Sequence, residues 1–469
     1  MFVVLGWIGC GSVLAQHLPD AVEKELKRVK IPPRAVGIYV QSLNRLGKTG
    51  ISVIALNESI PLIPASAMKV VTTYSALSLL GPAYRWKTRV YTQGQINDGI
   101  LTGNLHIKGS GDPRLNLESL WSLLRDVRSR GVRDIRGNLV LDRGAFENVV
   151  FDPARFDGEP FKPYNAGPDA LLLNHKVLNV RFMPNPLQRN VQVSLSPLLD
   201  GVSVIPPVLA DEGPCHSEWM RDIQLQISDK QVRFEGEYPL SCGEKTWYIY
   251  PHSMSDSGFF RAVFVTIWKE LGGTISGSVL SGTTPSSATL LTEWQSPALA
   301  EVVRDVNKYS NNVMARHLLL GIAAQSSSKA ASVSQGAFAI RAFLASRRIA
   351  LKGLQIENGS GLSRTERISA LTMGKMLADA YYSPVMPEFM ASLPVAGVDG
   401  TLTRQLKHSA LAGRAHLKTG AIQDVRAVAG YVLAASGERY VVVFMVNHPN
   451  AGSAKKARDA LLGWVYSKG

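Results

Sequence analysis

The stretch IPASAMKVVTTYSALSLLGP, residues 63–82, decides how the rest of the chain is interpreted. Ser66 and Lys69 lie three positions apart, a spacing that places both on one face of a helix. A serine nucleophile needs a base within hydrogen-bond reach, and a lysine removed from water can lose its proton near neutral pH. The apolar positions that follow, up to the Gly81-Pro82 stop, predict a buried helix that begins with this pair.

Two later motifs carry matching chemistry. Ser310-Asn311-Asn312 opens a helical run and supplies a hydroxyl that can relay a proton and an amide that can hold a peptide carbonyl. Lys418-Thr419-Gly420 ends a strand-like run, and an extended peptide can pair with such a strand edge because glycine permits close approach. The side chains of Lys418 and Thr419 are suited to binding a terminal carboxylate.

Each of these motifs is weak by itself. The S-x-x-K spacing recurs at Ser326 and Ser453, in a serine-rich segment and at a lysine-rich helix start, and K-T-G recurs at Lys48. The copy at Lys48 precedes Ser66 and so stands in the wrong order. The specific signal is therefore the ordered triple: S-x-x-K at one helix start, S-x-N at a second, and K-T-G on a late strand.

With the triple in this order, the sequence resembles the penicillin-recognising serine enzymes. Within them it resembles the low-molecular-mass class C penicillin-binding proteins, the D-alanyl-D-alanine carboxypeptidase/endopeptidases of peptidase family S13. The resemblance extends over most of the chain and includes residues 109–113, 163–166, 358–364 and 394–402, and a large segment between the first two motifs. One departure is Asn358, where the family more often has Asp; we expect it to affect a turn and not catalysis.

The resemblance implies roles for residues of all three motifs. Ser66 would be the acylated nucleophile, Lys69 the general base and Ser310 the proton relay. Asn312 would hold the substrate amide, and Lys418 and Thr419 would bind the carboxylate. The backbone N–H groups of Ser66 and Ala421 would form the oxyanion hole. It implies neither a metal nor an organic cofactor. Residues near Asp152–Asp157 are expected to border the substrate groove, with no individual role assigned.

The expected fold class is α+β. A β-lactamase/transpeptidase-like serine domain, an antiparallel sheet with helices, is split between residues 16–87 and 287–469 because strand and helix patterns of the same style occur at both ends. Residues 88–286 are expected to form an insertion that consists mostly of strands, with one clear helix over 116–130. We expect this insertion to contain two subdomains.

Composition limits the class of protein and its location. The chain has 469 residues, 45% of them hydrophobic, which excludes collagen, a coiled coil and wholesale disorder. Its net charge of +14 points to an anionic partner or surface. Residues 1–15 are uncharged and mostly apolar, and they predict a signal peptide for export to the periplasm, although a positive n-region is missing. A buried N-terminal strand or helix is the alternative.

Removal of residues 1–15 would also remove Cys10 and leave Cys215 and Cys242. An even pair in an exported chain favours a disulfide, and the alternative is two unrelated buried thiols. Two cysteines with only His216 nearby do not make a zinc site.

The sequence therefore predicts a serine DD-peptidase. It would cleave D-Ala-D-Ala termini of peptidoglycan stem peptides, with D-Ala-diaminopimelate cross-links as a further substrate, and β-lactam antibiotics would inhibit it covalently. A serine β-lactamase is one alternative, but no acidic motif for a deacylating base is evident. A non-catalytic basic protein that binds wall polymer is another, motivated by charge. Peripheral contact with an anionic envelope is also expected, and nucleic acid is not, because no zinc-finger spacing or RNP-like motif is present.

Overall fold

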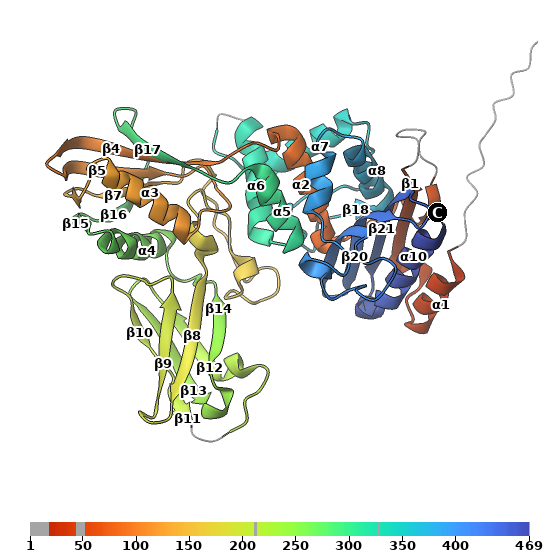
Figure 1. Ribbon diagram of the computed structural model, residues 1–469, viewed down its shortest axis with the longest axis horizontal. Coiled ribbons are helices and arrows are strands. Elements are labelled where there is room, and N and C mark those ends of the chain that lie inside the picture. Colours follow the sequence, from red (N-terminus) through yellow and green to blue (C-terminus); the bar gives the residue numbers. More distant parts are fainter. Residues whose placement is uncertain (1–17, 44–51, 211–212, 327–328, 469) are drawn as a thin grey trace, which may run out of the picture.

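The two ends of the chain build one antiparallel sheet. The computed structural model describes residues 18–43, 52–210, 213–326 and 329–468. Five strands follow the order β19-β20-β21-β1-β2 (Figure 1). Their bounds are β1 Val36–Ser42, β2 Ser52–Leu56, β19 Ala415–Ile422, β20 Val425–Leu433 and β21 Arg439–Asn447. The strand patterns at the two ends of the chain are thus confirmed, since β1 pairs with β2 and β20 with β21; the predicted signal peptide lies outside the described residues.

The central strand β21 explains why this sheet is covered on both faces. Val441, Val443 and Met445 pack into one core, and Val442, Phe444 and Val446 pack into another. Alternate side chains of a strand point to opposite faces, so the unbroken apolar run of β21 requires helices on both sides.

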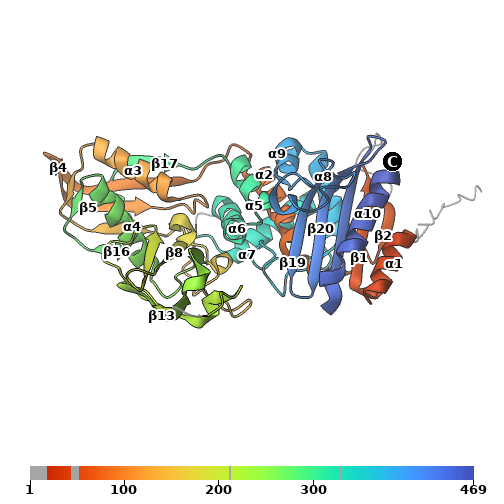
Figure 2. The ribbon, with the colours of Figure 1, turned by 60° about the horizontal axis from the view of Figure 1, so that its bottom comes forward.

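Helices supply both covering layers. The first core is shared with α2 (Lys69–Leu80), α5 (Leu299–Lys308), α6 (Asn312–Ser326), α7 (Val333–Ser346), α8 (Ala370–Tyr381) and α9 (Met386–Ser392). The second is shared with α1 (Asp20–Arg28) and α10 (Lys455–Lys468). In Figures 1 and 2, α2, α5 and α6 stand between the sheet and the insertion. Within the described ranges, no helix combines the length and the apolar character needed to cross a membrane.

The insertion contains two groups of strands. The first is a seven-stranded sheet of β4 (Lys87–Asn97), β5 (Ile100–Lys108), β6 (Asp134–Ile135), β7 (Leu139–Asp142), β15 (Thr274–Ile275), β16 (Val279–Ser281) and β17 (Thr289–Gln295). The second comprises β8 (Leu178–Asn185), β9 (Asn190–Ser196), β10 (Ser203–Ile205), β11 (Val208–Ala210), β12 (Ile223–Ile227), β13 (Gln231–Pro239) and β14 (Lys245–Ile249). Figure 1 shows the second group below the first. We propose that the two groups are the two subdomains expected from the sequence. Strand β17 pairs with β4 although it lies beyond residue 286, and the boundaries at 88 and 286 stay predictions.

One helix of the insertion was not anticipated. The expected helix at 116–130 is present as α3 (Leu117–Ser129), with the Asn116 side chain accepting a hydrogen bond from the Ser119 N–H as its cap. The additional helix is α4 (Asp256–Glu270). It buries Phe259, Phe260 and the consecutive run 262–265, so its sequence lacks the one-sided apolar pattern by which an exposed helix is recognised. Sequence periodicity could not separate it from a buried strand.

A small two-stranded sheet completes the described strands. It pairs β3 (Pro61–Leu62) with β18 (Ile368–Ser369). The side chain of Asn447, at the end of β21, bonds both to the N–H and to the carbonyl of Ile63, at 2.8 and 3.0 Å. These contacts fix the chain just before the S-x-x-K motif to the end of the central strand β21.

The expected disulfide is present. Cys215 and Cys242 are bonded, which excludes the alternative of two unrelated thiols. The bond ties the segment after β11 to the turn after β13, next to the ring cluster of Phe182, Trp219 and Tyr238.

Loss of this disulfide should destabilise the insertion. The bond closes a loop with a sequence separation of 27, for which chain entropy gives about 3.5 kcal/mol. We expect a Cys215→Ser, Cys242→Ser double variant to lose about that much free energy of unfolding in urea titrations. Dithiothreitol should lower the stability of the wild type by a similar amount and leave the variant unchanged. Equal stability of the oxidised wild type and the variant would contradict the expectation.

Candidate active site

Ser66 lies in a short 3-10 helix, Ala65–Met68, directly before α2. Two glycines allow other segments to close on its backbone. A Cβ on Gly420 of β19 would stand 3.1 Å from the Ser66 nitrogen and 2.5 Å from the Pro64 carbonyl. A Cβ on Gly361, whose φ is +81°, would stand 1.9 Å from the Ala65 carbonyl. The K-T-G strand and the 358–361 turn are therefore held in contact with the serine from two sides.

Lys69 is fully buried and is surrounded by acceptors. Its Nζ lies 3.1 Å from Ser66 Oγ and 2.6 Å from Asn312 Oδ1, and it also donates to the Ser360 carbonyl. The amide oxygen and the carbonyl can only accept, so both must receive N–H bonds. A neutral amine has two N–H groups and one lone pair, which leaves the lone pair for the hydroxyl of Ser66.

A second pair faces the same site from the other side. Lys418, also fully buried, donates from Nζ to Ser310 Oγ at 2.9 Å and to the Thr419 carbonyl at 2.8 Å. Thr419 Oγ1 lies 3.0 Å from Thr401 Oγ1. Ser310 itself has a φ of +57°, an uncommon conformation for a residue with a Cβ that recurs at functional sites.

Burial sets the electrostatics of both lysines. Removal from water lowers the pKa of Lys69 well below its ordinary value, and the charges of Lys418 and Arg316 lower it further, while the charge of Glu366 raises it. Burial lowers the pKa of Lys418 to about 7. Lys69 is therefore suited to accepting a proton, and Lys418 remains partly charged near neutral pH.

The structure brings the three predicted motifs together. Lys69 joins Ser66 to Asn312, and Lys418 joins Ser310 to the strand that carries Thr419. Ala421 follows Gly420 in β19 and pairs with Arg426 of β20. The catalytic roles assigned to these residues, including the oxyanion hole, stay predictions, because proximity by itself assigns no chemical step.

Part of the insertion lies against this site. Arg155 Nη2 is 3.4 Å from Glu357 Oε1, which joins the expected groove segment 152–157 to the turn before Ser360. The guanidinium of Arg364 lies 5.5 Å from the centre of the Phe156 ring and donates to the Gln423 carbonyl, just after β19. The segment is thus anchored to two loops beside the catalytic candidates.

Sequence patterns missed three contributors to the site. The Ser360 carbonyl is a backbone group, which no side-chain pattern reports, although residues 358–364 were part of the resemblance. Arg316 is almost fully buried on α6 and donates to the Ala166 carbonyl at 2.6 Å. Glu366 is fully buried and accepts N–H bonds of the same turn. The sequence offered one signal for Arg316, namely that a charged residue stands within an otherwise apolar helical stretch.

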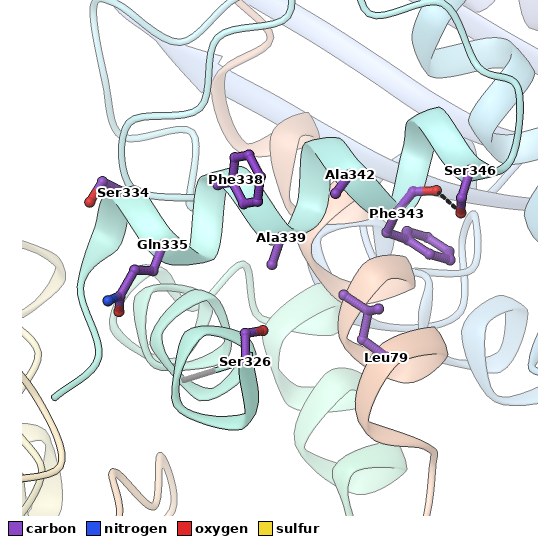
Figure 3. Close-up of a pocket in the computed structure, with 9 residues that line it drawn as sticks. All are labelled: Leu79, Ser326, Ser334, Gln335, Phe338, Ala339, Ala342, Phe343 and Ser346. Atoms are coloured by element: carbon purple, nitrogen blue, oxygen red, sulfur yellow. Dashed lines mark hydrogen bonds between the residues drawn. The ribbon is translucent and has the colours of Figure 1, made fainter. Parts of the chain in front are cut away.

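An apolar groove of about 650 Å³ lies elsewhere, between α2, α6 and α7. Figure 3 shows Phe338, Ala342 and Phe343 of α7 with Leu79 of α2 across from them. None of the predicted catalytic side chains lines it, so it is separate from the candidate site. Among the described residues, no cluster of three or more His, Cys, Asp or Glu side chains is arranged to hold a metal ion.

Comparisons of sequence agree with this geometry. The sequence model of the D-Ala-D-Ala carboxypeptidase 3 (S13) family matches residues 18–468. A D-alanyl-D-alanine carboxypeptidase from an Actinomadura strain is 28% identical over 424 residues, 85% of this chain and 76% of the relative. D-alanyl-D-alanine carboxypeptidase DacB of Haemophilus influenzae is 24% identical over 398 residues, 84% of this chain and 82% of the relative.

Comparison with solved structures supports the fold. Penicillin binding protein 4 from Haemophilus influenzae matches with a TM-score of 0.78 at 23% identity, covering 94% of this chain and 99% of that one. The same protein complexed with a β-lactam matches with a TM-score of 0.75 over the same shares of both chains. The expected fold class is confirmed.

The buried charge of Lys418 should appear in the pH dependence of stability. Its pKa is about 7 in the folded protein and ordinary in the unfolded chain, so between these values the unfolded chain binds a proton that the folded protein lacks. The free energy of unfolding of the wild type should therefore rise with pH above 7, by up to about 1.4 kcal/mol per pH unit from this group. Lys418→Met lacks this contribution.

The measurement compares urea unfolding of Lys418→Met and of the wild type between pH 7 and 9. The variant should have its largest relative stability at pH 7, and the difference should shrink as pH rises. Parallel curves would contradict the lowered pKa of Lys418.

Proposed function

Because the chain belongs to the D-Ala-D-Ala carboxypeptidase 3 (S13) family, it is a penicillin-binding serine DD-peptidase, and we propose that Ser66 is the nucleophile of this activity. The observation that supports this assignment best is the contact of Lys69 with both Ser66 and Asn312. A serine beside a buried amine, with an amide and a second lysine-bound hydroxyl next to it, provides the parts for acyl transfer.

The proposed first step is attack of Ser66 Oγ on the carbonyl of the penultimate D-alanine. Lys69 takes the hydroxyl proton, which its lowered pKa allows at neutral pH because burial disfavours the ammonium form. The backbone N–H groups of Ser66 and Ala421 stabilise the oxyanion, a contribution that can reach several kcal/mol in such sites.

Ser310 is proposed to pass a proton to the leaving D-alanine amine. Its hydroxyl accepts a hydrogen bond from Lys418 Nζ, so the hydroxyl proton can pass to the amine while Lys418 supplies its replacement. Water then cleaves the acyl-enzyme, and Lys69 returns its proton to Ser66 Oγ. No described residue is assigned as the base for this second step.

Substrate placement is proposed to rest on two contacts. Asn312 directs Oδ1 to Lys69, so its Nδ2 is available to a substrate carbonyl. Lys418 and the hydroxyl of Thr419 would bind the terminal carboxylate, a charge-assisted interaction suited to the free end of a stem peptide. Residues 152–157 would form the outer wall of the groove, because their contacts with Glu357 and Arg364 hold them beside the site.

We also propose export to the periplasm and peripheral contact with an anionic envelope. The disulfide between Cys215 and Cys242 supports an oxidising compartment. The net charge of +14 supports attraction to anionic lipid or to carboxylates of the wall.

Labelling by a fluorescent penicillin tests the assignment of Ser66. We expect a long-lived covalent adduct on the wild type, none on Ser66→Ala, and a mass shift on the peptide that contains residue 66. Lys69→Met should label at least a hundredfold more slowly, because general-base catalysis contributes about 10²–10⁴ in rate. Both variants should keep the wild-type circular dichroism spectrum.

Three outcomes would count against this proposal. Labelling that survives in Ser66→Ala would remove its role as nucleophile. Rapid release of hydrolysed drug would favour a β-lactamase. Absence of labelling in folded wild type would favour a wall-binding protein without catalysis.

Close packing of β19 on Ser66 can be tested separately. Gly420→Ala places a Cβ 2.5 Å from the Pro64 carbonyl and 2.9 Å from the Ala67 nitrogen, so the strand must move away from the nucleophile. Overpacking of this kind costs about 1–3 kcal/mol, and we expect the labelling rate to fall at least tenfold. The matched control is Gly463→Ala in α10, where a Cβ meets nothing within 4 Å and labelling should keep its wild-type rate. Equal rates in both variants would contradict the close approach.

A further inference from the structure

Glu366 is a fully buried carboxylate outside the three motifs. Its Oε1 accepts N–H bonds from Glu357, Asn358 and Gly359 at 3.1, 2.9 and 2.7 Å. Three backbone donors on one oxygen stabilise the ionised form and fix the path of the chain that supplies them. Glu366 thereby sets the shape of the turn that follows residue 357.

This turn carries one of the acceptors of Lys69. Asn358 Oδ1 accepts hydrogen bonds from the N–H and the hydroxyl of Ser360, at 2.9 and 2.6 Å. The Ser360 carbonyl in turn accepts a hydrogen bond from Lys69 Nζ. Gly361, the next residue, packs on the backbone of Ala65. A displacement of the turn would therefore change both the direction of the Lys69 lone pair and the support of the Ser66 backbone.

The distribution of buried charge also indicates a role for Glu366. Three buried or nearly buried cationic side chains, Lys69, Lys418 and Arg316, meet in this region, and Glu366 is the anion whose charge raises the pKa of Lys69. Burial raises the pKa of Glu366 itself, while the backbone N–H groups act in the opposite direction. The N–H of Gly361 adds a fourth backbone group of the same turn to those that lower the pKa of Glu366 and so favour the carboxylate.

We propose that Glu366 is a positioning residue for Lys69, which holds the 357–361 turn in place and supplies the negative charge that balances the buried cations. The proposal rests on Lys69 being the general base. It assigns Glu366 no contact with substrate, because its side chain is enclosed and its Oε1 is taken by backbone donors.

The test is the pH profile of acylation by a fluorescent penicillin in Glu366→Gln. A general base acts only when deprotonated, so the acid limb of the profile follows the pKa of Lys69. Removal of the negative charge lowers that pKa, and we expect the midpoint of the acid limb to move down by about one pH unit, the lower end of the effect of a nearby charge. The maximal rate should fall about tenfold because a neutral amide holds the turn less firmly.

Two further variants separate charge from general damage to the turn. Asn358→Asp combined with Glu366→Gln returns a carboxylate to the same turn, since the side-chain oxygen at position 358 already accepts two hydrogen bonds there. The midpoint should return toward the wild-type value. Ser363→Ala removes an uncharged hydroxyl that accepts from the N–H groups of Thr365 and Glu366 and donates to the Glu357 carboxylate. Because the variant keeps both Glu366 and Glu357, its midpoint should stay at the wild-type value whatever its rate.

A folded Glu366→Gln protein with wild-type rate and midpoint would overturn the proposal. If that variant does not fold, the double variant decides: a wild-type midpoint supports the role of the charge, and a shifted midpoint or loss of folding overturns it. Failure of the proposed function would be recognised separately, because labelling would then survive in Ser66→Ala.

Discussion

The burial of one amine, Lys69 Nζ, is the constraint on which the rest of the site depends. An amino group without water is costly unless every neighbouring polar group is in place. Its hydrogen-bond partners come from the 3-10 helix before α2, from the start of α6 and from the turn at Ser360. These segments meet only in the complete fold. The burial that disfavours the charged form of Lys69 is therefore tolerated only when all three segments are correctly placed.

Much of this arrangement could be predicted from local sequence. The spacing of Ser66 and Lys69 fixes their common face, and the order of the three motifs led to the remaining side chains. The central strands were recognisable because they are short and, like β21 with its three consecutive valines, rich in β-branched residues. Helix α4 could not be recognised, since it is apolar on several sides. The role of the Ser360 carbonyl could not be predicted either, because every residue has a backbone carbonyl and the sequence does not indicate which one contacts Lys69.

The insertion contacts the catalytic part through small apolar clusters, such as Phe146 and Ala170 against Leu320 of α6, and through polar contacts close to the site. Arg316 of α6 donates to the Ala166 carbonyl, and the ion pair of Arg155 with Glu357 ends on the turn that Glu366 organises. The insertion therefore reaches the same backbone that positions Lys69. A displacement of residues 152–157 would act on this turn through the ion pair of Arg155 with Glu357, so the insertion contributes to the geometry around Lys69.

The order of strands in the central sheet has a consequence for how the enzyme is made. β1 lies between β2 and β21 in the sheet. β1 is synthesised near the start of the chain, and it can pair with β21 only after the ribosome has nearly reached the end. Pairing between such distant segments is slow to form because a long loop must close first. During synthesis Ser66 thus exists long before Lys418 does, and the proposed site is incomplete until β19 has been made and has paired with β20.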